Sequence, residues 1–150
     1  MATADRAQLA NLAAMARSIF QQVGATEVAQ PELTTLVNFN GTNGSNPVAG
    51  LIADAQGDLF GTATIGGVKC SGIGCGTLFE LTPSGTSFTF RLIHQFTGPP
   101  DGADPEWSGL IPGPGGTLIG TTRSGGTARR CSDGGPGGVL GCGTVYQITP

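Results

Sequence analysis

Charged side chains are scarce in this sequence. Asp, Glu, Lys and Arg make up 11% of the 150 residues, against roughly 25% in an ordinary globular domain. The seven Lys and Arg residues are scattered, and only Arg129 and Arg130 are adjacent. Because a nucleic-acid-binding surface needs clustered basic side chains, nucleic acid is not expected as a partner. A run of about 18 apolar residues is also lacking, so no membrane span is predicted.

Histidine is scarcer still, with His94 as the only one. Nucleophilic triads built on serine or cysteine use a histidine as their base, so this one residue restricts that class of enzyme. His94 lies on the apolar side of an alternating segment, and the sequence identifies no orienting partner for it. We interpret it as a packed side chain. Carboxylate pairs suited to glycoside cleavage do not recur between the two repeats described below. We therefore do not expect an enzyme.

Glycine and proline, by contrast, are abundant, with 27 and 10 residues. Disordered chains usually combine low hydrophobicity with high net charge. Here 38% of the residues are hydrophobic and the formal net charge is −3. We therefore interpret the glycines as turns between many short strands rather than as a sign of disorder.

The strongest pattern is an internal repeat, with copies that begin near Leu36 and near Ile93. The offset between matching positions grows from 57 residues at Phe39 to 67 at Cys75. Most of that growth falls between Gly67 and Gly74, which predicts a surface loop there. The matched segments are Phe39 with Phe96, 43–47 with 101–105, 50–52 with 109–111, 57–62 with 116–121, 66–67 with 125–126, 74–77 with 141–144 and 82–83 with 149–150.

Each copy is predicted to form four short strands separated by turns. Four strands in about 58 residues is the size of one β-propeller blade. The sequence therefore predicts an all-β fold of two four-stranded propeller-like blades, residues 31–87 and 88–150, preceded by one N-terminal α-helix. The expected strands are 34–39, 51–53, 58–62 and 77–82 in the first copy, and 88–96, 110–111, 117–121 and 144–149 in the second.

A single four-stranded sheet leaves apolar faces open, and repeat proteins bury such faces by stacking neighbouring units. Two blades cannot close a ring, because propellers have roughly four to eight. Either the chain is a fragment of a longer repeat protein or copies of it associate. Association would give a ring of three or four chains, or a filament if the head-to-tail contact does not close. We therefore expect a homo-oligomer or filament.

Residues 1–30 are predicted to form an amphipathic helix and a linker. Over residues 4–23 the apolar side chains fall on one stripe at helical spacing. This helix is expected to cover a blade edge of its own chain or to contact another subunit. Docking on a membrane surface is disfavoured, because only Arg6 and Arg17 are basic. A signal peptide is the remaining alternative.

The four cysteines occupy matching places in the two copies. The repeat predicts one disulfide within each copy, Cys70 with Cys75 and Cys131 with Cys142. Such disulfides would imply an oxidising compartment. Free thiols and a four-cysteine zinc site are the alternatives. The zinc site is disfavoured because Cys131 and Cys142 are spaced too widely for a zinc-binding pair.

One acidic cluster, Asp101, Asp104 and Glu106, precedes the single tryptophan, Trp107. Aspartate beside glycine is typical of turns in which the side chain accepts backbone hydrogen bonds. A calcium site is the alternative, and it would need six to eight oxygen ligands. Trp107 could stack on a sugar, anchor a subunit interface or belong to the core. We treat these four residues as candidate ligand or interface positions and predict no cofactor other than the calcium alternative.

The composite motif resembles the bacterial GloVer tandem-repeat family, over about residues 33–150. The resemblance implies a secreted or surface-anchored β-propeller-like protein and carries over no catalytic residue. We therefore expect a non-enzymatic extracellular or cell-surface assembly module of bacterial origin, with a carbohydrate-binding propeller-type lectin as the alternative. The resemblance rests, in the first copy, on Leu36, Phe39, 43–47, 50–52, 57–62, 66–67 and 74–83, and on their second-copy equivalents.

Overall fold

The computed structural model describes residues 11, 15, 30–68, 70, 72–107, 109–128, 131 and 141–150. The chain divides into two compact units, Met1–Thr34 and Thr35–Pro150. In the first unit Asn11 and Met15 are helical, and the rest of the predicted N-terminal helix lies outside the described residues. No helix in the described part of the chain is long and apolar enough to cross a membrane.

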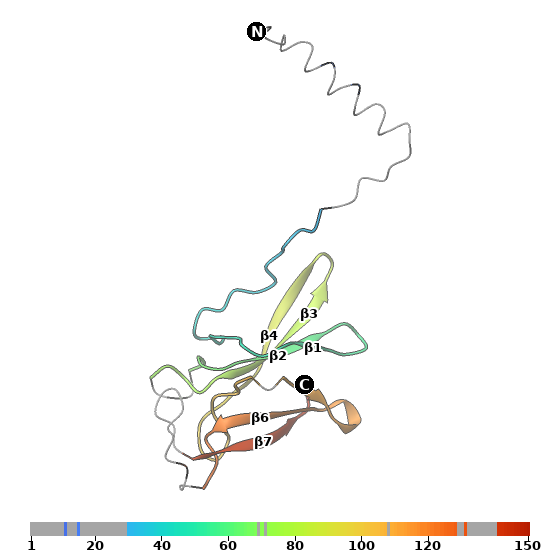
Figure 1. Ribbon diagram of the computed structural model, residues 1–150. Coiled ribbons are helices and arrows are strands. Elements are labelled where there is room, and N and C mark those ends of the chain that lie inside the picture. The colour runs from blue at the N-terminus through green and yellow to red at the C-terminus, as the bar shows by residue number, and fades with distance from the viewer. Residues whose placement is uncertain are drawn as a thin grey trace, which may run out of the picture. The chain divides into compact units, whose positions relative to one another are not determined.

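The second unit begins with a four-stranded antiparallel sheet (Figure 1). Neighbouring strands in this sheet are also neighbours in sequence, so each connection is a simple reversal of the chain. The last two strands form a hairpin in which Ser84 pairs with Ser87. Gly85 adopts a φ of 62° at the turn, a conformation that glycine reaches without steric cost. The strands are β1 (Ile52–Ala53), β2 (Leu59–Ala63), β3 (Thr77–Ser84) and β4 (Ser87–Gln95).

A three-stranded antiparallel sheet follows, with the same order of strands along the chain. It contains β5 (Ile111–Pro112), β6 (Leu118–Ser124) and β7 (Cys142–Ile148), and a short 3-10 helix, η1 (Pro114–Gly116), connects the first two. The all-β class is thus confirmed, as two antiparallel sheets of four and three strands. Neither sheet closes on itself, and the described residues form no propeller ring.

The boundary between the sheets differs from the expected boundary between the repeats. Residues 34–39, predicted as the first strand of the first copy, form no strand. Residues 88–96, predicted to open the second blade, lie almost entirely in β4, which pairs with β3 in the first sheet. The reason is the tight hairpin at Gly85, which returns the chain directly beside β3. Each sheet is therefore shifted by one strand relative to the sequence repeat, and the second sheet has three strands instead of four.

The main core lies where the two sheets pack face to face. Leu78 of β3 and Phe60 of β2 are buried against Leu110 and Leu118 of the second sheet. Burying each such side chain contributes about 1.5–3 kcal/mol. Tyr146 and Ile148 of β7 pack on the same cluster. The face of the first sheet that contains Leu78 thus packs against the face of the second sheet that contains Tyr146. These two faces are not equivalent in the repeat, because Leu78 matches Val145 on the other side of β7.

Local geometry recurs at matched positions of the two copies. Asn46 and Asp104 have φ values of 55° and 56°. The ring centroids of Phe39 and Phe79 lie 5.1 Å apart at an interplanar angle of 67°. Those of Phe96 and Tyr146 lie 5.2 Å apart at 64°. Equivalent residues therefore make equivalent contacts, although the sheets differ in strand number.

Both predicted disulfides are present, Cys70–Cys75 and Cys131–Cys142. The first closes a loop directly before β3, and Cys75 is buried in a second small cluster with Phe96 and Ala103. Two disulfides are typical of a protein from an oxidising environment.

Candidate functional site

The three carboxylates of the acidic cluster lie in three different surroundings. Asp101 accepts hydrogen bonds from the backbone N–H of Thr97 at 2.8 Å and from the Thr97 hydroxyl at 3.1 Å. Nε2 of His94 lies 3.0 Å from both of its carboxylate oxygens. Asp101 therefore closes its own loop through Thr97, four residues before it, rather than through the backbone two residues on as in the predicted turn, and it also orients the only histidine. The sequence analysis missed this pair, although the intervening Gly-Pro-Pro-Asp-Gly segment is a strong turn signal.

Asp104 is fully buried, next to Pro105, in the segment that lies between the two sheets. Its backbone N–H donates to the carbonyl of Cys75, in the loop directly before β3, at 3.0 Å. One carboxylate oxygen accepts a hydrogen bond from the Ser124 hydroxyl at 2.7 Å, and the other has no hydrogen-bond partner among the described residues. Burial raises the pKa of Asp104 above its ordinary value, because the charged form is desolvated. The carbonyl of Pro105 accepts a hydrogen bond from Thr62 of β2, so this segment joins the sheets.

Trp107 is on the surface, and the largely covered Glu106 lies with it beside Arg123. Arg123 and Glu106 form an ion pair at 3.6 Å. Trp107 is 80% exposed and lines a shallow hollow with these two residues. The core interpretation of Trp107 is therefore wrong, and the sugar-stacking and interface interpretations stand. Trp107 has a φ of 50°, in the left-handed region that few residues other than glycine adopt.

The structure does not assemble the acidic cluster into a calcium site. Asp101 pairs with His94, Asp104 with Ser124 and Glu106 with Arg123. Among the described residues, no group of three His, Cys, Asp or Glu side chains is arranged to hold a metal ion.

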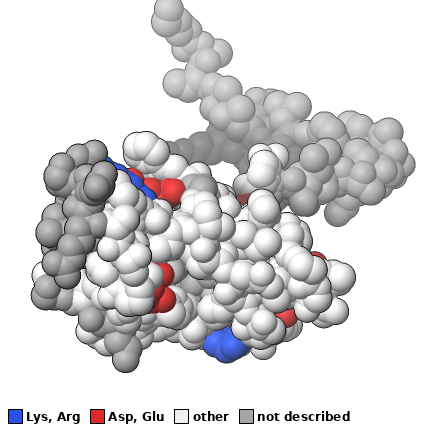
Figure 2. Space-filling model, turned by 90° about the horizontal axis from the view of Figure 1, so that it is seen from below, with Lys and Arg blue, Asp and Glu red and all other residues white. Residues whose placement is uncertain are grey.

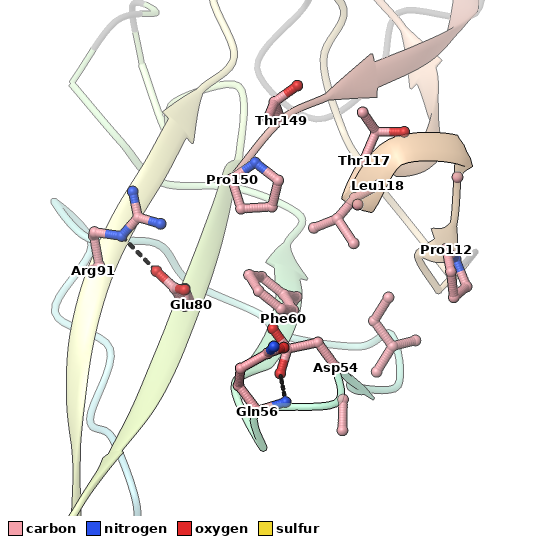
Figure 3. A pocket seen from close by; sticks show the side chains of 14 residues that line it. Asp54, Gln56, Phe60, Glu80, Arg91, Pro112, Thr117, Leu118, Thr149 and Pro150 are labelled. Atoms are coloured by element: carbon pink, nitrogen blue, oxygen red, sulfur yellow. Dashed lines mark hydrogen bonds and ion pairs between the residues drawn. The ribbon is translucent and has the colours of Figure 1, made fainter.

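A cavity of about 370 Å³ lies between the two sheets (Figure 3). Phe60 and Leu118 form part of its wall. Glu80 in its lining forms an ion pair with Arg91 on the neighbouring strand. Within this ion pair, the hydrogen bond that Arg91 Nε donates to Glu80 raises the pKa of the Arg91 guanidinium above its usual value. Asp54, also in the lining, accepts the backbone N–H groups of Gln56 and Asp58, both at 2.9 Å. Both carboxylates thus have structural partners.

The second sheet has an apolar face with no partner in the described part of the chain. We define the open face of the second sheet as Ile111, Ile119, Val145 and Gln147, which share one side through direct pairing and alternation. Val145 is 77% exposed on this face. Its equivalent in the first sheet, Leu78, is 0% exposed because the second sheet covers it.

The first sheet has the complementary set of unburied positions. We define the open flank of the first sheet as Asn46, Pro47 and Leu51. Leu51 is 49% exposed, whereas its equivalent Leu110 is 2% exposed in the core between the sheets. Asn46 and Pro47 are exposed, whereas their equivalents Asp104 and Pro105 are inserted between the sheets.

Two further features accompany these surfaces. The outer edge of β7 pairs with no strand of the described residues, whereas the equivalent edge of β3 pairs with β4. Charge is sparse on the molecule: in Figure 2 most of the face on view is uncharged, with a few isolated acidic and basic side chains. Apolar faces and a free strand edge on a surface of low charge are features of a protein that contacts another chain.

The fold and these surfaces define an all-β protein of two stacked antiparallel sheets with open faces at both ends of the stack. No protein-family model matches the chain, and no curated protein or solved structure matches it. Its function is therefore inferred from the surfaces described above.

Proposed function

We propose that the protein is a non-enzymatic assembly module that associates with copies of itself. The observation that carries this proposal is the contrast between Leu78, fully buried under the second sheet, and Val145, its largely exposed equivalent. The equivalent face is therefore covered in the first sheet and open in the second sheet. An apolar surface of this kind marks an interaction site.

The contact inside the chain supplies the geometry of the contact between chains. Within one chain, Leu110 and the Asp104–Pro105 segment of the second sheet pack on the first sheet. In the assembly, Leu51 and the Asn46–Pro47 segment of one copy pack on the open face of the second sheet of another. The two surfaces are different, so the contact is head to tail. It gives a ring if the rotation closes and a filament if it does not.

The setting of this function is also part of the proposal. The two disulfides support an extracellular or cell-surface location, since such bonds persist in oxidising surroundings. The resemblance to GloVer repeats supports a bacterial, propeller-like assembly in which each sheet is one blade.

The test is the mass of the native particle in solution. Val145→Asp places a charge on the open face of the second sheet and is expected to leave single, folded chains. Val68→Asp is the matched control, because Val68 is also an exposed valine but lies in a loop outside both surfaces. Sedimentation and electron microscopy compare the two variants with the unaltered protein. A wild-type protein that remains a monomer at all concentrations would disprove the proposal.

A carbohydrate-binding function is the second candidate, and the exposed indole of Trp107 favours it. An aromatic face beside a charged pair provides stacking and hydrogen bonds to a sugar. Glu106 and Arg123 are such a pair, in the same shallow hollow. A glycan array probed with the unaltered protein and with Trp107→Ala tests this candidate. Binding that Trp107→Ala abolishes supports it, and an array without signal rejects it.

A further inference from the structure

An unpaired strand edge and a segment without a strand occur together in this chain. In the first sheet, β4 covers the outer edge of β3. In the second sheet, no described strand covers the outer edge of β7. The segment that matches the last four residues of β4, 92–95, is residues 35–38, and it forms no helix or strand. In the described part of the chain, the edge of β7 thus lacks the strand that its equivalent in the first sheet has, and residues 35–38 match part of that strand.

The repeat fixes how the two would pair. In the first sheet Gln95 of β4 lies opposite Thr77, and His94 lies opposite Leu78. Shifting each residue to its equivalent in the other copy places Asn38 opposite Thr144 and Val37 opposite Val145. The register shift between Leu78 and Phe79 then places Thr35 opposite Tyr146, on the other side of the sheet.

We propose that residues 35–38 of one copy add to the free edge of β7 in the next copy as its fourth strand, with Val37 opposite Val145. This inference rests on the proposed self-association and names the segment that links one copy to the next. Strand addition satisfies the backbone N–H and C=O groups of the open edge. It also places Val37 on the open face of the second sheet, beside the exposed Val145.

The position of Phe39 supports this arrangement. Inside the chain, β4 belongs to the first sheet, and Phe96, directly after it, packs on Tyr146 of the second sheet. Phe39 makes the equivalent contact with Phe79 of its own first sheet. The residue after the donor segment is therefore already in the place that a bridging strand requires. The contact between copies continues the contact between the two sheets of one chain.

A cross-linking experiment on the full chain tests the register. Two variants that each carry one added cysteine beside the four native ones, Val37→Cys and Val145→Cys, are mixed, dialysed together and oxidised. Directly opposite residues in a sheet have Cβ atoms about 4.5–5.5 Å apart, close to disulfide distance. The matched control mixes Thr35→Cys with Val145→Cys, since Thr35 would lie on the opposite side. Mass spectrometry of the digested product identifies which cysteines are joined, and sedimentation of each mixture gives its particle size.

The expected result is a covalent dimer through residues 37 and 145, absent from the control mixture. Particles of several copies without this link, or with equal linkage from position 35, overturn the strand addition and leave self-association standing. A chain carrying both Val37→Cys and Val145→Cys is oxidised in parallel. Linkage within single chains shows that the segment folds back on its own β7 and overturns the proposal. Single chains throughout refute self-association itself.

Discussion

Leu110 and Leu51 occupy equivalent positions in the repeat, but Leu110 is buried and Leu51 is half exposed. Truncating each leucine to alanine therefore measures the effect of burial for the same residue type at the same repeat position. Leu110 is buried between the sheets with Phe60, Leu78 and Leu118. Leu51 packs over the first sheet but keeps about half of its surface exposed to solvent. We expect Leu110→Ala to destabilise the isolated chain strongly and Leu51→Ala to affect it weakly.

The magnitudes follow from the two exposures. Removing a fully buried leucine side chain costs about 2–5 kcal/mol, because the lost transfer energy is joined by the cost of a cavity. A leucine that is half exposed gains only about 1 kcal/mol from its burial, and no closed cavity forms when it is truncated. The expected difference in the free energy of unfolding between the two variants is therefore at least about 1 kcal/mol.

Urea unfolding followed by far-ultraviolet circular dichroism measures these free energies, at concentrations where sedimentation shows single chains. Trp107 fluorescence is a poor probe, because this indole is already mostly exposed in the folded state. At higher concentration Leu51→Ala is also expected to weaken assembly, since Leu51 lies on the open flank of the first sheet. Equal losses from the two truncations in the single chain would refute the assignment of Leu110 to the core between the sheets.

Two further changes act on unpaired buried polar groups. Tyr146→Phe is expected to raise the free energy of unfolding by about 1 kcal/mol, because the Tyr146 hydroxyl is buried with no hydrogen-bond partner among the described residues. The same burial raises the pKa of Tyr146 to about 12, and the equivalent residue in the first copy is Phe79. A loss of stability in urea unfolding would contradict this expectation. Asp104→Asn is expected to stabilise the protein at pH 7 by an amount of order 1 kcal/mol, since Asn46 has the same backbone conformation and carries no charge. Burial raises the pKa of folded Asp104 above the ordinary value of 3.8. The wild type therefore loses stability relative to the variant as the pH rises from the pKa of unfolded Asp104 through the higher pKa of the folded protein. Thermal melts from pH 3 to 8 should show the gap between the two proteins widening with pH, and a constant gap would count against the reasoning.

The sequence predicted what depends on local pattern. The strands from Ile52 onward, their turns and both disulfides follow from alternation, glycine placement and the matching cysteines. The assignment of β4 to the first sheet was not predicted, because the repeat begins near Leu36 and Ile93 and the expected second blade, residues 88–150, therefore included that strand. A repeat in sequence has no marked start, and only the hairpin at Gly85 decides which sheet receives the strand.

The candidate site was predicted only where its residues are neighbours in sequence. Asp101 forms the expected turn, but its contact with His94 depends on how the intervening loop folds back. The burial of Asp104 could not be read from its segment, because Asn46 in the matching segment is exposed. The difference arises from the first sheet, which packs against Asp104 and has no counterpart against Asn46 among the residues that the structure describes.

The one-strand offset between repeat and sheet affects how such a protein can grow or be cut. In this chain the second copy supplies β4 to the sheet of the first copy, so the strand itself joins the two copies. A cut at the predicted boundary between the repeats, residues 87–88, falls at the turn between β3 and β4 and would separate β4 from the rest of its sheet. A cut after Gln95 would leave both sheets whole.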